Sequence, residues 1–220
     1  MISIVVPLIL ASFAATQPAP KCCTVDQWEG FESEVAGVVP QGQQAVVIDA
    51  GMAVHYDGTN QKIAAEGPVT TGGQTVNVNL IQDYSKKLQY VIINSNNCTK
   101  SPLGNFKKAC VPGDATLMGN YYFGGKAQNL PITAYQMIVQ NLQVQVGVTS
   151  IGCYPVEEII VGQTGGVDVS EVFNFVNITD GVKDPSVFTP PAICDTAPFT
   201  QNVQLPPGSK MFRGRGFLTL

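Results

Sequence analysis

The chemistry open to this sequence is limited first by its histidines, because the 220 residues contain only one, His55. Nucleophilic and general acid–base mechanisms commonly depend on an imidazole, so any such mechanism here would have to use His55. The residue lies in an alternating stretch before Tyr56-Asp57-Gly58, where a polar residue on one face of a β-strand is the simpler interpretation.

Other catalytic motifs are absent from the sequence. It contains no Gly-x-Ser-x-Gly elbow, phosphate-binding loop, His-Glu-x-x-His or dinucleotide fingerprint. Glu157 and Glu158 are adjacent in a predicted strand, so their carboxylates would point to opposite faces and make a poor acid–base pair. The sequence therefore predicts a protein that is not an enzyme.

Six cysteines supply the clearest covalent chemistry of the chain. They are Cys22, Cys23, Cys98, Cys110, Cys153 and Cys194. An even number of cysteines in a chain with a secretory signal predicts three disulfides, and the spacing matches no zinc-binding motif. The sequence by itself leaves every pairing of the six open.

Two N-glycosylation sequons are present, Asn97-Cys98-Thr99 and Asn177-Ile178-Thr179. In a secreted chain both predict surface asparagines that carry glycans. The Asn97 sequon has a cysteine as its middle residue, so a disulfide would compete with its modification; a sequon that stays unused is the alternative for both.

The charge distribution argues against nucleic acid as a partner. The chain has a formal net charge of −4, of which residues 201–220 contribute three positive charges and no acid, so residues 1–200 carry −7. An acidic body repels nucleic acid and attracts cations. Scattered carboxylates could bind calcium, but Asp57-Gly58-Thr59-Asn60 lacks the ligand pattern of an EF-hand. The sequence identifies no metal ligand and predicts no cofactor other than calcium.

Residues 1–14 form an apolar run that ends in Ser12-Phe13-Ala14, which suits signal peptidase. The run is too short to span a bilayer and is typical of a secretory signal peptide. Since no later stretch is apolar for long enough to be membrane-spanning, we expect a secreted, extracellular protein. The remainder suits one domain, residues 15–194, followed by a flexible basic tail, residues 195–220.

Hydrophobic alternation predicts strands along most of the chain. Apolar residues alternate with polar ones at 75–80 and at 142–148. Similar patterns predict strands at 46–48, 52–56, 62–65, 88–93, 117–123, 135–139, 156–161 and 167–178. With 22 glycines and 15 prolines to form turns, these strands predict an all-β fold of two curved antiparallel sheets, arranged as a sandwich or half-open barrel. Helical patterns are short, at 26–31 and 180–188.

A proline-rich segment, residues 183–194, has the sequence KDPSVFTPPAIC. Pro185, Pro190 and Pro191 exclude a helix interior and a central strand. We interpret the segment, called the strap below, as a stiff connection across the sheets. Its apolar Val187 and Phe188 would help to close the interior, and Cys194 would tie down its end.

Four segments together resemble the ependymin-related family. They are Cys22…Trp28-Glu29-Gly30, Tyr56-Asp57-Gly58-Thr59-Asn60-Gln61-Lys62, Cys153-Tyr154-Pro155-Val156-Glu157-Glu158 and the strap. They occur in the family's order and spread from residue 22 to residue 194. The resemblance implies a secreted, disulfide-bonded and usually N-glycosylated protein that is associated with calcium, extracellular matrix and lipid-like ligands.

The resemblance also implies particular structural features. Cys22 would pair with Cys153 and Cys98 with Cys194, which leaves Cys23 with Cys110. The fold would be similar to bacterial periplasmic lipoprotein carriers, with an apolar pocket between the sheets, and the chain would form a homodimer. Candidates for the pocket are Leu142, Val144, Val146, Val148, Phe173, Phe175 and, from the strap, Phe188; ordinary core packing is the alternative for each of them.

Two classes of function remain open at this point. The protein could bind lipid-like molecules in such a pocket as a carrier. It could instead be a structural or adhesive component of an extracellular matrix, including a calcified one, that acts through its acidic surface, its glycans and calcium. An accessible apolar cavity would favour the carrier, and a filled core with a carboxylate-dense face would favour the matrix component.

Overall fold

The computed structural model describes residues 18–201, apart from residues 43, 140 and 165. The predicted signal peptide at 1–14 and residues 202–220 of the predicted tail lie outside these residues. Helices within the described ranges are all too short or too polar to cross a membrane.

Within the described residues the chain forms thirteen strands and two short 3-10 helices. The strands are β1 (Cys22–Cys23), β2 (Gln27–Pro40), β3 (Val46–Asp57), β4 (Lys62–Thr71), β5 (Gln74–Asp83), β6 (Leu88–Ile93), β7 (Asn97–Pro102), β8 (Cys110–Val111), β9 (Thr116–Gly125), β10 (Gln128–Val139), β11 (Leu142–Thr149), β12 (Pro155–Thr164) and β13 (Val167–Asp180). The expected all-β fold is confirmed.

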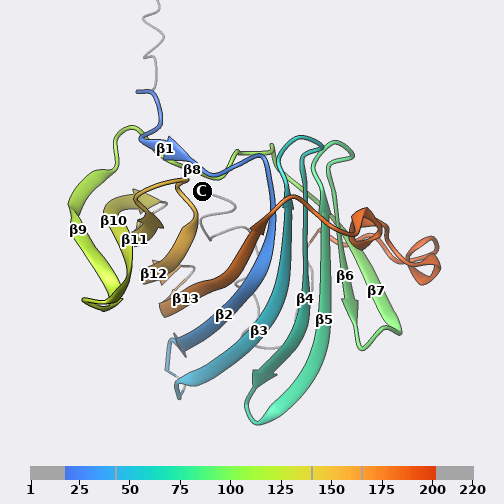
Figure 1. Cartoon of the computed structure of the whole chain (residues 1–220). Helices are drawn as coiled ribbons and strands as arrows, with labels where there is room; N and C mark the ends of the chain where they lie inside the picture. The colour runs from blue at the N-terminus through green and yellow to red at the C-terminus, as the bar shows by residue number, and fades with distance from the viewer. Residues whose placement is uncertain (1–17, 43, 140, 165, 202–220) are drawn as a thin grey trace, which may run out of the picture.

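Eleven strands make one antiparallel sheet in the order β7-β6-β5-β4-β3-β2-β13-β12-β11-β10-β9, and β1 pairs with β8 in a second, small sheet. Figure 1 shows that the large sheet curves strongly and that its edges, β7 and β9, are not joined. The expected pair of curved antiparallel sheets in an open arrangement is therefore confirmed, with two sheets of very unequal size.

The hydrophobic core lies on the concave side of the large sheet, which we call the inner face; the convex side is the outer face. Side chains alternate between the two faces along each strand. In β3, for example, the inner positions from Ile48 to Tyr56 are at most 3% exposed. Buried residues of β2–β6 and β10–β13 belong to one hydrophobic cluster, so both halves of the curved sheet contribute to a single core.

One end of the concavity is closed by β1, β8 and the connection between β7 and β8. Phe106 in this connection packs against Tyr56 and Tyr84, with ring centroids 6.2 and 5.3 Å apart. The amide of Ala109 donates a hydrogen bond to the Tyr56 hydroxyl at 3.1 Å. The connection therefore holds the aromatic end of the core.

Three disulfides are formed, which confirms that all six cysteines are paired. Cys22 bonds to Cys153, Cys23 to Cys110 and Cys98 to Cys194. These are the pairs that the family resemblance implies. The first joins β1 of the small sheet to the turn before β12, and the second joins β1 to its partner β8. The third joins the end of the strap to β7.

Sequence reasoning missed the short strands β1 and β8, the edge strand β7 and, most consequentially, β2 at the centre of the sheet. The predicted short helix at 26–31 is wrong, because residues from Gln27 onward form β2, which pairs with both β3 and β13. The inner positions of β2 include Gly30, Glu32 and Glu34, so the alternation of apolar residues that marks a half-buried strand is lost. By contrast, β6 begins and ends at the predicted residues, 88 and 93.

The strap contains the 3-10 helices η1 (Pro185–Phe188) and η2 (Ala192–Cys194) and lies against the outer face, beside β6 and β7 in Figure 1. Phe188 is 5% exposed and packs with Ala64, Ile81 and Ile92 in a second hydrophobic cluster. These three residues alternate with the inner-facing Ile63, Leu80 and Val91. The strap therefore does not close the interior, and Phe188 covers the opposite face of the sheet from the core.

After Cys194 the chain continues along the β7 edge. The Lys100 amide donates to the carbonyl of Pro198 at 3.0 Å, and the Thr200 amide donates to the carbonyl of Lys100 at 2.8 Å. Phe199 forms a parallel bridge with Lys100. The first residues of the predicted tail thus cover the edge of β7.

Candidate functional site

Six of the seven predicted pocket residues lie together on the inner face. Leu142, Val144, Val146 and Val148 are the inner positions of β11, and Phe173 and Phe175 are inner positions of β13. All six are between 1% and 7% exposed. The seventh, Phe188, lies on the outer face for the reason given above, so the structure separates it from this set.

Four glutamates share the inner face with these apolar side chains. Glu32 and Glu34 lie on β2, Glu158 on β12 and Glu171 on β13, which are three adjacent strands. Glu34 and Glu158 are the cross-strand neighbours of Phe173 on its two sides, and Glu171 precedes Phe173 by two residues on the same strand. We call these four residues the inner glutamate cluster.

Burial of this cluster is deep. Glu34 is 2% exposed, and Glu158 and Glu171 are 0% exposed. Burial, followed by repulsion from Glu32 and Glu171, raises the pKa of Glu34 to about 8. Among the described residues, Oε1 of Glu34 has no hydrogen-bond partner. A buried carboxylate without a partner is strongly unfavourable, so such a group is either protonated or meets a cation.

Glu32 is the least buried member of the cluster. Burial raises its pKa to about 7, but its side chain is only half-buried, unlike that of Glu34. Part of Glu32 is therefore accessible to solvent on the inner face, between its cross-strand neighbours Met52 and Phe175.

Sequence reasoning did not find the inner glutamate cluster. It considered Glu158 only as a possible acid–base partner of Glu157, and the structure confirms that the two point to opposite faces. The signal was available in the i, i+2 spacing of Glu32 and Glu34, but it becomes visible only once residues 27–40 are known to be a strand.

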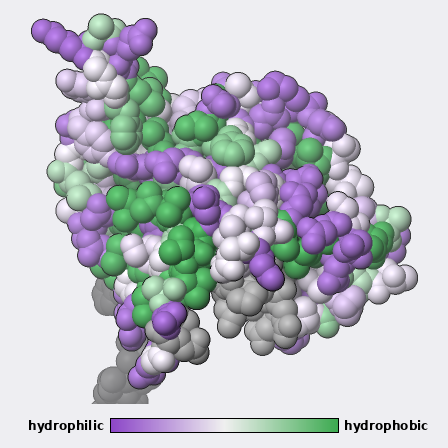
Figure 2. All heavy atoms as spheres, turned by 90° about the horizontal axis from the view of Figure 1, so that it is seen from below, coloured by the Kyte–Doolittle hydropathy of each residue, from purple (hydrophilic) through white to green (hydrophobic). Residues whose placement is uncertain are grey.

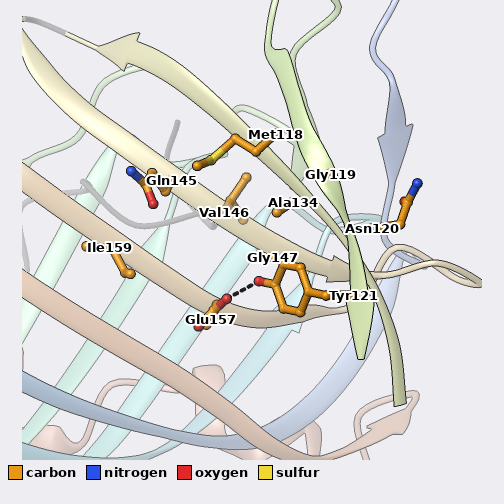
Figure 3. Close-up of a pocket in the computed structure, with 10 residues that line it drawn as sticks. All are labelled: Met118, Gly119, Asn120, Tyr121, Ala134, Gln145, Val146, Gly147, Glu157 and Ile159. Atoms are coloured by element: carbon orange, nitrogen blue, oxygen red, sulfur yellow. Dashed lines mark hydrogen bonds between the residues drawn. The ribbon is translucent and has the colours of Figure 1, made fainter. Parts of the chain in front are cut away.

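A groove lies on the outer face of β9–β12, with a volume of about 420 Å³. Figure 3 shows its lining, in which the Tyr121 hydroxyl donates a hydrogen bond to the Glu157 carboxylate across Gly147. Burial and this hydrogen bond raise the pKa of Tyr121 to about 12. The remaining lining includes Met118, Ala134 and Ile159. The groove and the interior are therefore separated by the thickness of the sheet.

Exposed apolar side chains are concentrated near this groove. Those of β9 and β10 are Leu117, Met118, Tyr121, Tyr122, Phe123, Leu130 and Ile138, each at least 40% exposed. Figure 2, seen from below, shows apolar residues gathered on the side of the molecule that carries β9–β12. No other described strand pairs with the outer edge of β9. We call this surface the β9 edge.

The segments that carry the family resemblance meet at one end of the sheet. Trp28 stacks on Tyr56 with ring centroids 5.8 Å apart. Glu29 accepts hydrogen bonds from the strap, where Lys183 Nζ lies 2.6 Å and the Lys183 amide 3.1 Å from its carboxylate. A Cβ at Gly58 would lie 2.7 Å from the Tyr56 hydroxyl, so this turn position needs glycine. These contacts hold the scaffold, and of the residues in these segments only Glu158 belongs to the inner glutamate cluster.

The remaining predicted residues lie at or near the surface. His55 is 3.4 Å from Glu29, on the strand face predicted for it. Asn97 begins β7 and Asn177 lies in the bulge between Val176 and Thr179; both side chains are exposed, as glycosylation would require. Within the described ranges, no group of three or more His, Cys, Asp or Glu residues is arranged to hold a metal ion.

Comparisons with known proteins support the resemblance. A family model described as Ependymin matches residues 72–194. Ependymin-related protein 1 of Haliotis asinina is 26% identical over 186 residues, covering 79% of this chain and 90% of the relative. Mammalian ependymin-related protein 1 of Rattus norvegicus is 27% identical over 187 residues, covering 82% of this chain and 78% of the relative.

Solved structures give more distant likenesses. An uncharacterized conserved protein from Thermus thermophilus has a TM-score of 0.48 and 10% identity, covering 79% of this chain and 89% of that one. A LolA superfamily protein from Nitrosomonas europaea has a TM-score of 0.32 and 8% identity, covering 75% of this chain and 90% of that one.

Proposed function

Since the chain belongs to the ependymin family, we propose that it is a secreted, non-enzymatic protein that binds an apolar, lipid-like ligand against the inner face of its curved sheet. The observation that carries the proposal is the partial exposure of Glu32 on the inner face, beside buried apolar side chains of β3 and β13. The three disulfides fit an extracellular protein.

The shape of the sheet supports entry of a ligand. Because β7 and β9 are not joined, the concavity can widen without breaking the hydrogen bonds of any strand pair. Each methylene of an alkyl chain that leaves water contributes about 0.8 kcal/mol. A ligand chain of moderate length would therefore bind with useful affinity even if its head group contributed nothing.

Native mass spectrometry of the full-length protein, secreted from cells, tests the proposal. We expect a mass excess that solvent extraction removes and that analysis identifies as lipid, and we expect the extracted protein to bind a fluorescent fatty acid. Variant Val35→Ser alters an exposed residue of the outer face and should bind like the wild type. Extracted protein that binds the probe no better than a filled β-sandwich of similar size would overturn the proposal.

The β9 edge favours a second candidate function, adhesion within an extracellular matrix. An open strand edge with exposed aromatic residues can pair with another chain. On this reading the β9 edge also forms the expected homodimer, and sedimentation at micromolar concentration should show a dimer that the variant Tyr122→Lys dissociates. A wild type that sediments only as a monomer would contradict the homodimer.

Calcium and glycans belong to the same candidate function. We propose that surface carboxylates bind calcium weakly and that Asn97 and Asn177 carry glycans. Calorimetric titration of calcium into chelator-treated protein should show heat of binding, and enzymatic deglycosylation should lower the mass of the secreted chain. Absence of binding heat would contradict calcium binding, and an unchanged mass would contradict glycosylation.

A further inference from the structure

We propose that the inner glutamate cluster binds the protonated amine of an amphipathic ligand, so that the protein selects basic lipids over neutral and acidic ones. This inference rests on the proposed function, because it assigns a head group to the ligand of the same interior.

The cluster is placed where a head group would meet the apolar residues. Glu32 and Glu34 are two residues apart on β2, and neighbours at this spacing lie roughly 7 Å apart on one face of a strand. Glu171 is diagonal to Glu34 across the β2–β13 pair, at a similar separation. Phe173, a predicted pocket residue, lies between Glu34 and Glu158. Carboxyl groups and an apolar surface therefore alternate over one small area.

The surrounding inner positions bring no positive charge to the cluster. Those of β3, β10, β11, β12 and β13 include no lysine, arginine or histidine; besides the glutamates, their polar or titratable members include Tyr56, Asn129, Thr133, Tyr135 and Asp180. Oε1 of Glu34, a side chain that is 2% exposed, has no hydrogen-bond partner among the described residues. This oxygen is an acceptor that the described protein leaves unused, and the partly accessible Glu32 lies two residues away on the same face of β2.

An ammonium group suits this arrangement better than a metal ion. An ammonium has three donors and can bridge two or three carboxylates that remain several ångströms apart. A calcium ion needs six to eight oxygens at roughly 2.3–2.6 Å, gathered much more tightly. An amine on an alkyl chain would place its charge at the glutamates and its chain along the valines of β11.

The charge states predict how binding depends on pH. Burial raises the pKa of Glu32 to about 7 and that of Glu34 to about 8, so both carboxyl groups gain negative charge as the pH rises from 6 to 8.5. An alkylamine stays protonated throughout this range, since amines of this kind have a pKa near that of lysine, about 10.4. Amine binding should therefore strengthen with pH and should release protons.

The test compares decylamine, decanol and decanoate, each below its micelle concentration, by calorimetric titration of the full-length, lipid-extracted protein. At pH 8.5 we expect decylamine to bind roughly tenfold or more tightly than decanol, as charge-assisted hydrogen bonds allow, and decanoate to bind least. At pH 6 the preference for decylamine should shrink. Titration in buffers of different ionisation heat should detect the released protons.

Two variants locate the effect. Glu34→Gln and Glu32→Gln keep the side-chain volume and should each reduce the preference for decylamine while leaving decanol binding unchanged. Glu66→Gln is the matched control, because Glu66 is an exposed acid on the outer face that accepts a hydrogen bond from Asn79. It should keep the full preference for decylamine.

The outcomes separate this inference from the proposed function. Equal binding of decylamine and decanol by the wild type overturns the amine assignment and leaves a lipid-binding protein. Absence of binding by all three compounds overturns both. A third outcome uses the full-length triple variant Lys210→Gln, Arg213→Gln, Arg215→Gln. If this variant prefers decylamine to decanol and the wild type does not, the assignment is also overturned, because the glutamates would then bind basic residues of this chain and not a ligand amine.

Discussion

The strand β2 carries carboxylates with opposite environments on its two faces. On the outer face, Glu29 lies 2.6 Å from Lys183 Nζ, and hydrogen bonding to Lys183 lowers the pKa of Glu29. On the inner face, three and five residues later, burial raises the pKa of Glu32 and Glu34 above 4.5, to about 7 and about 8. The outer carboxylate helps to hold the fold together, whereas the inner ones reduce stability whenever they are ionised.

This difference separates scaffold from site. Where polar residues of the inner face are only structural, they are satisfied: Gln82 donates to Gln89 at 2.7 Å and accepts from the Tyr84 hydroxyl at 3.2 Å. In the inner glutamate cluster, by contrast, Oε1 of Glu34 has no hydrogen-bond partner among the described residues. Groups that destabilise a fold and are still present in its core mark a functional site.

The largest expected effect tests the separation of the two faces. Phe188 is buried under the strap on the outer face, so Phe188→Ala should lower the free energy of unfolding by about 4 kcal/mol, the usual cost of truncating a packed phenylalanine. Binding of decanol to the folded variant should not change, because Phe188 does not touch the core cluster. Denaturant unfolding and calorimetric titration measure the two quantities. A variant that loses decanol binding while folded would place the strap in the site.

The second effect concerns the inner carboxyl groups and the pH. Their pKa values are higher in the folded state than in the unfolded chain, so folding binds protons and stability decreases as the pH rises from about 5 to 8. We expect the ligand-free protein to lose several kcal/mol over this range, since each pKa unit of each group corresponds to about 1.4 kcal/mol. Denaturant unfolding at several pH values measures the loss.

Substitution of Glu34 sharpens the same comparison. The side chain of Glu34→Gln cannot ionise, so the stability of this variant should decrease less between pH 5 and pH 8, and the variant should be more stable than the wild type at pH 8. Glu66→Gln, on the outer face, should lose as much stability over this range as the wild type. A wild type whose stability does not change between pH 5 and pH 8 would show that the inner carboxyl groups meet compensating charges.

The difference between the two faces also explains which parts of the structure the sequence could predict. Strands with apolar inner positions, such as β6 and β11, follow from alternation alone. The strand β2 was missed because Glu32 and Glu34 occupy two of its inner positions, so the same residues that form the candidate site removed the signal for the element that carries them. The ependymin-related family was recognised correctly, but from segments that mainly build the scaffold and share only Glu158 with the candidate site.

The strap shows a second kind of limit. Its prolines and its terminal disulfide could be predicted, and so could the burial of Phe188. The face that it covers could not, because this depends on where β13 ends and on the register of β4, β5 and β6, which place Ala64, Ile81 and Ile92 outward. A one-residue shift in register would exchange the two faces.

The smallest expected effect has the opposite pH dependence and completes the comparison on β2. Lys183→Met removes the cation that lies beside Glu29, and because Lys183 is 74% exposed, we expect a loss of about 0.5 kcal/mol at pH 7, the range of surface ion pairs. The pKa of Glu29 is lower in the folded state than in the unfolded chain, so this contribution is present above about pH 4.5 and disappears as the pH falls through the folded-state value. The difference between wild type and variant in the denaturant concentration of unfolding should therefore shrink as the pH falls below 4.5, and added salt should reduce it at pH 7. A difference that does not shrink as the pH falls would mean that Lys183 stabilises the start of the strap through packing of its side chain rather than through Glu29.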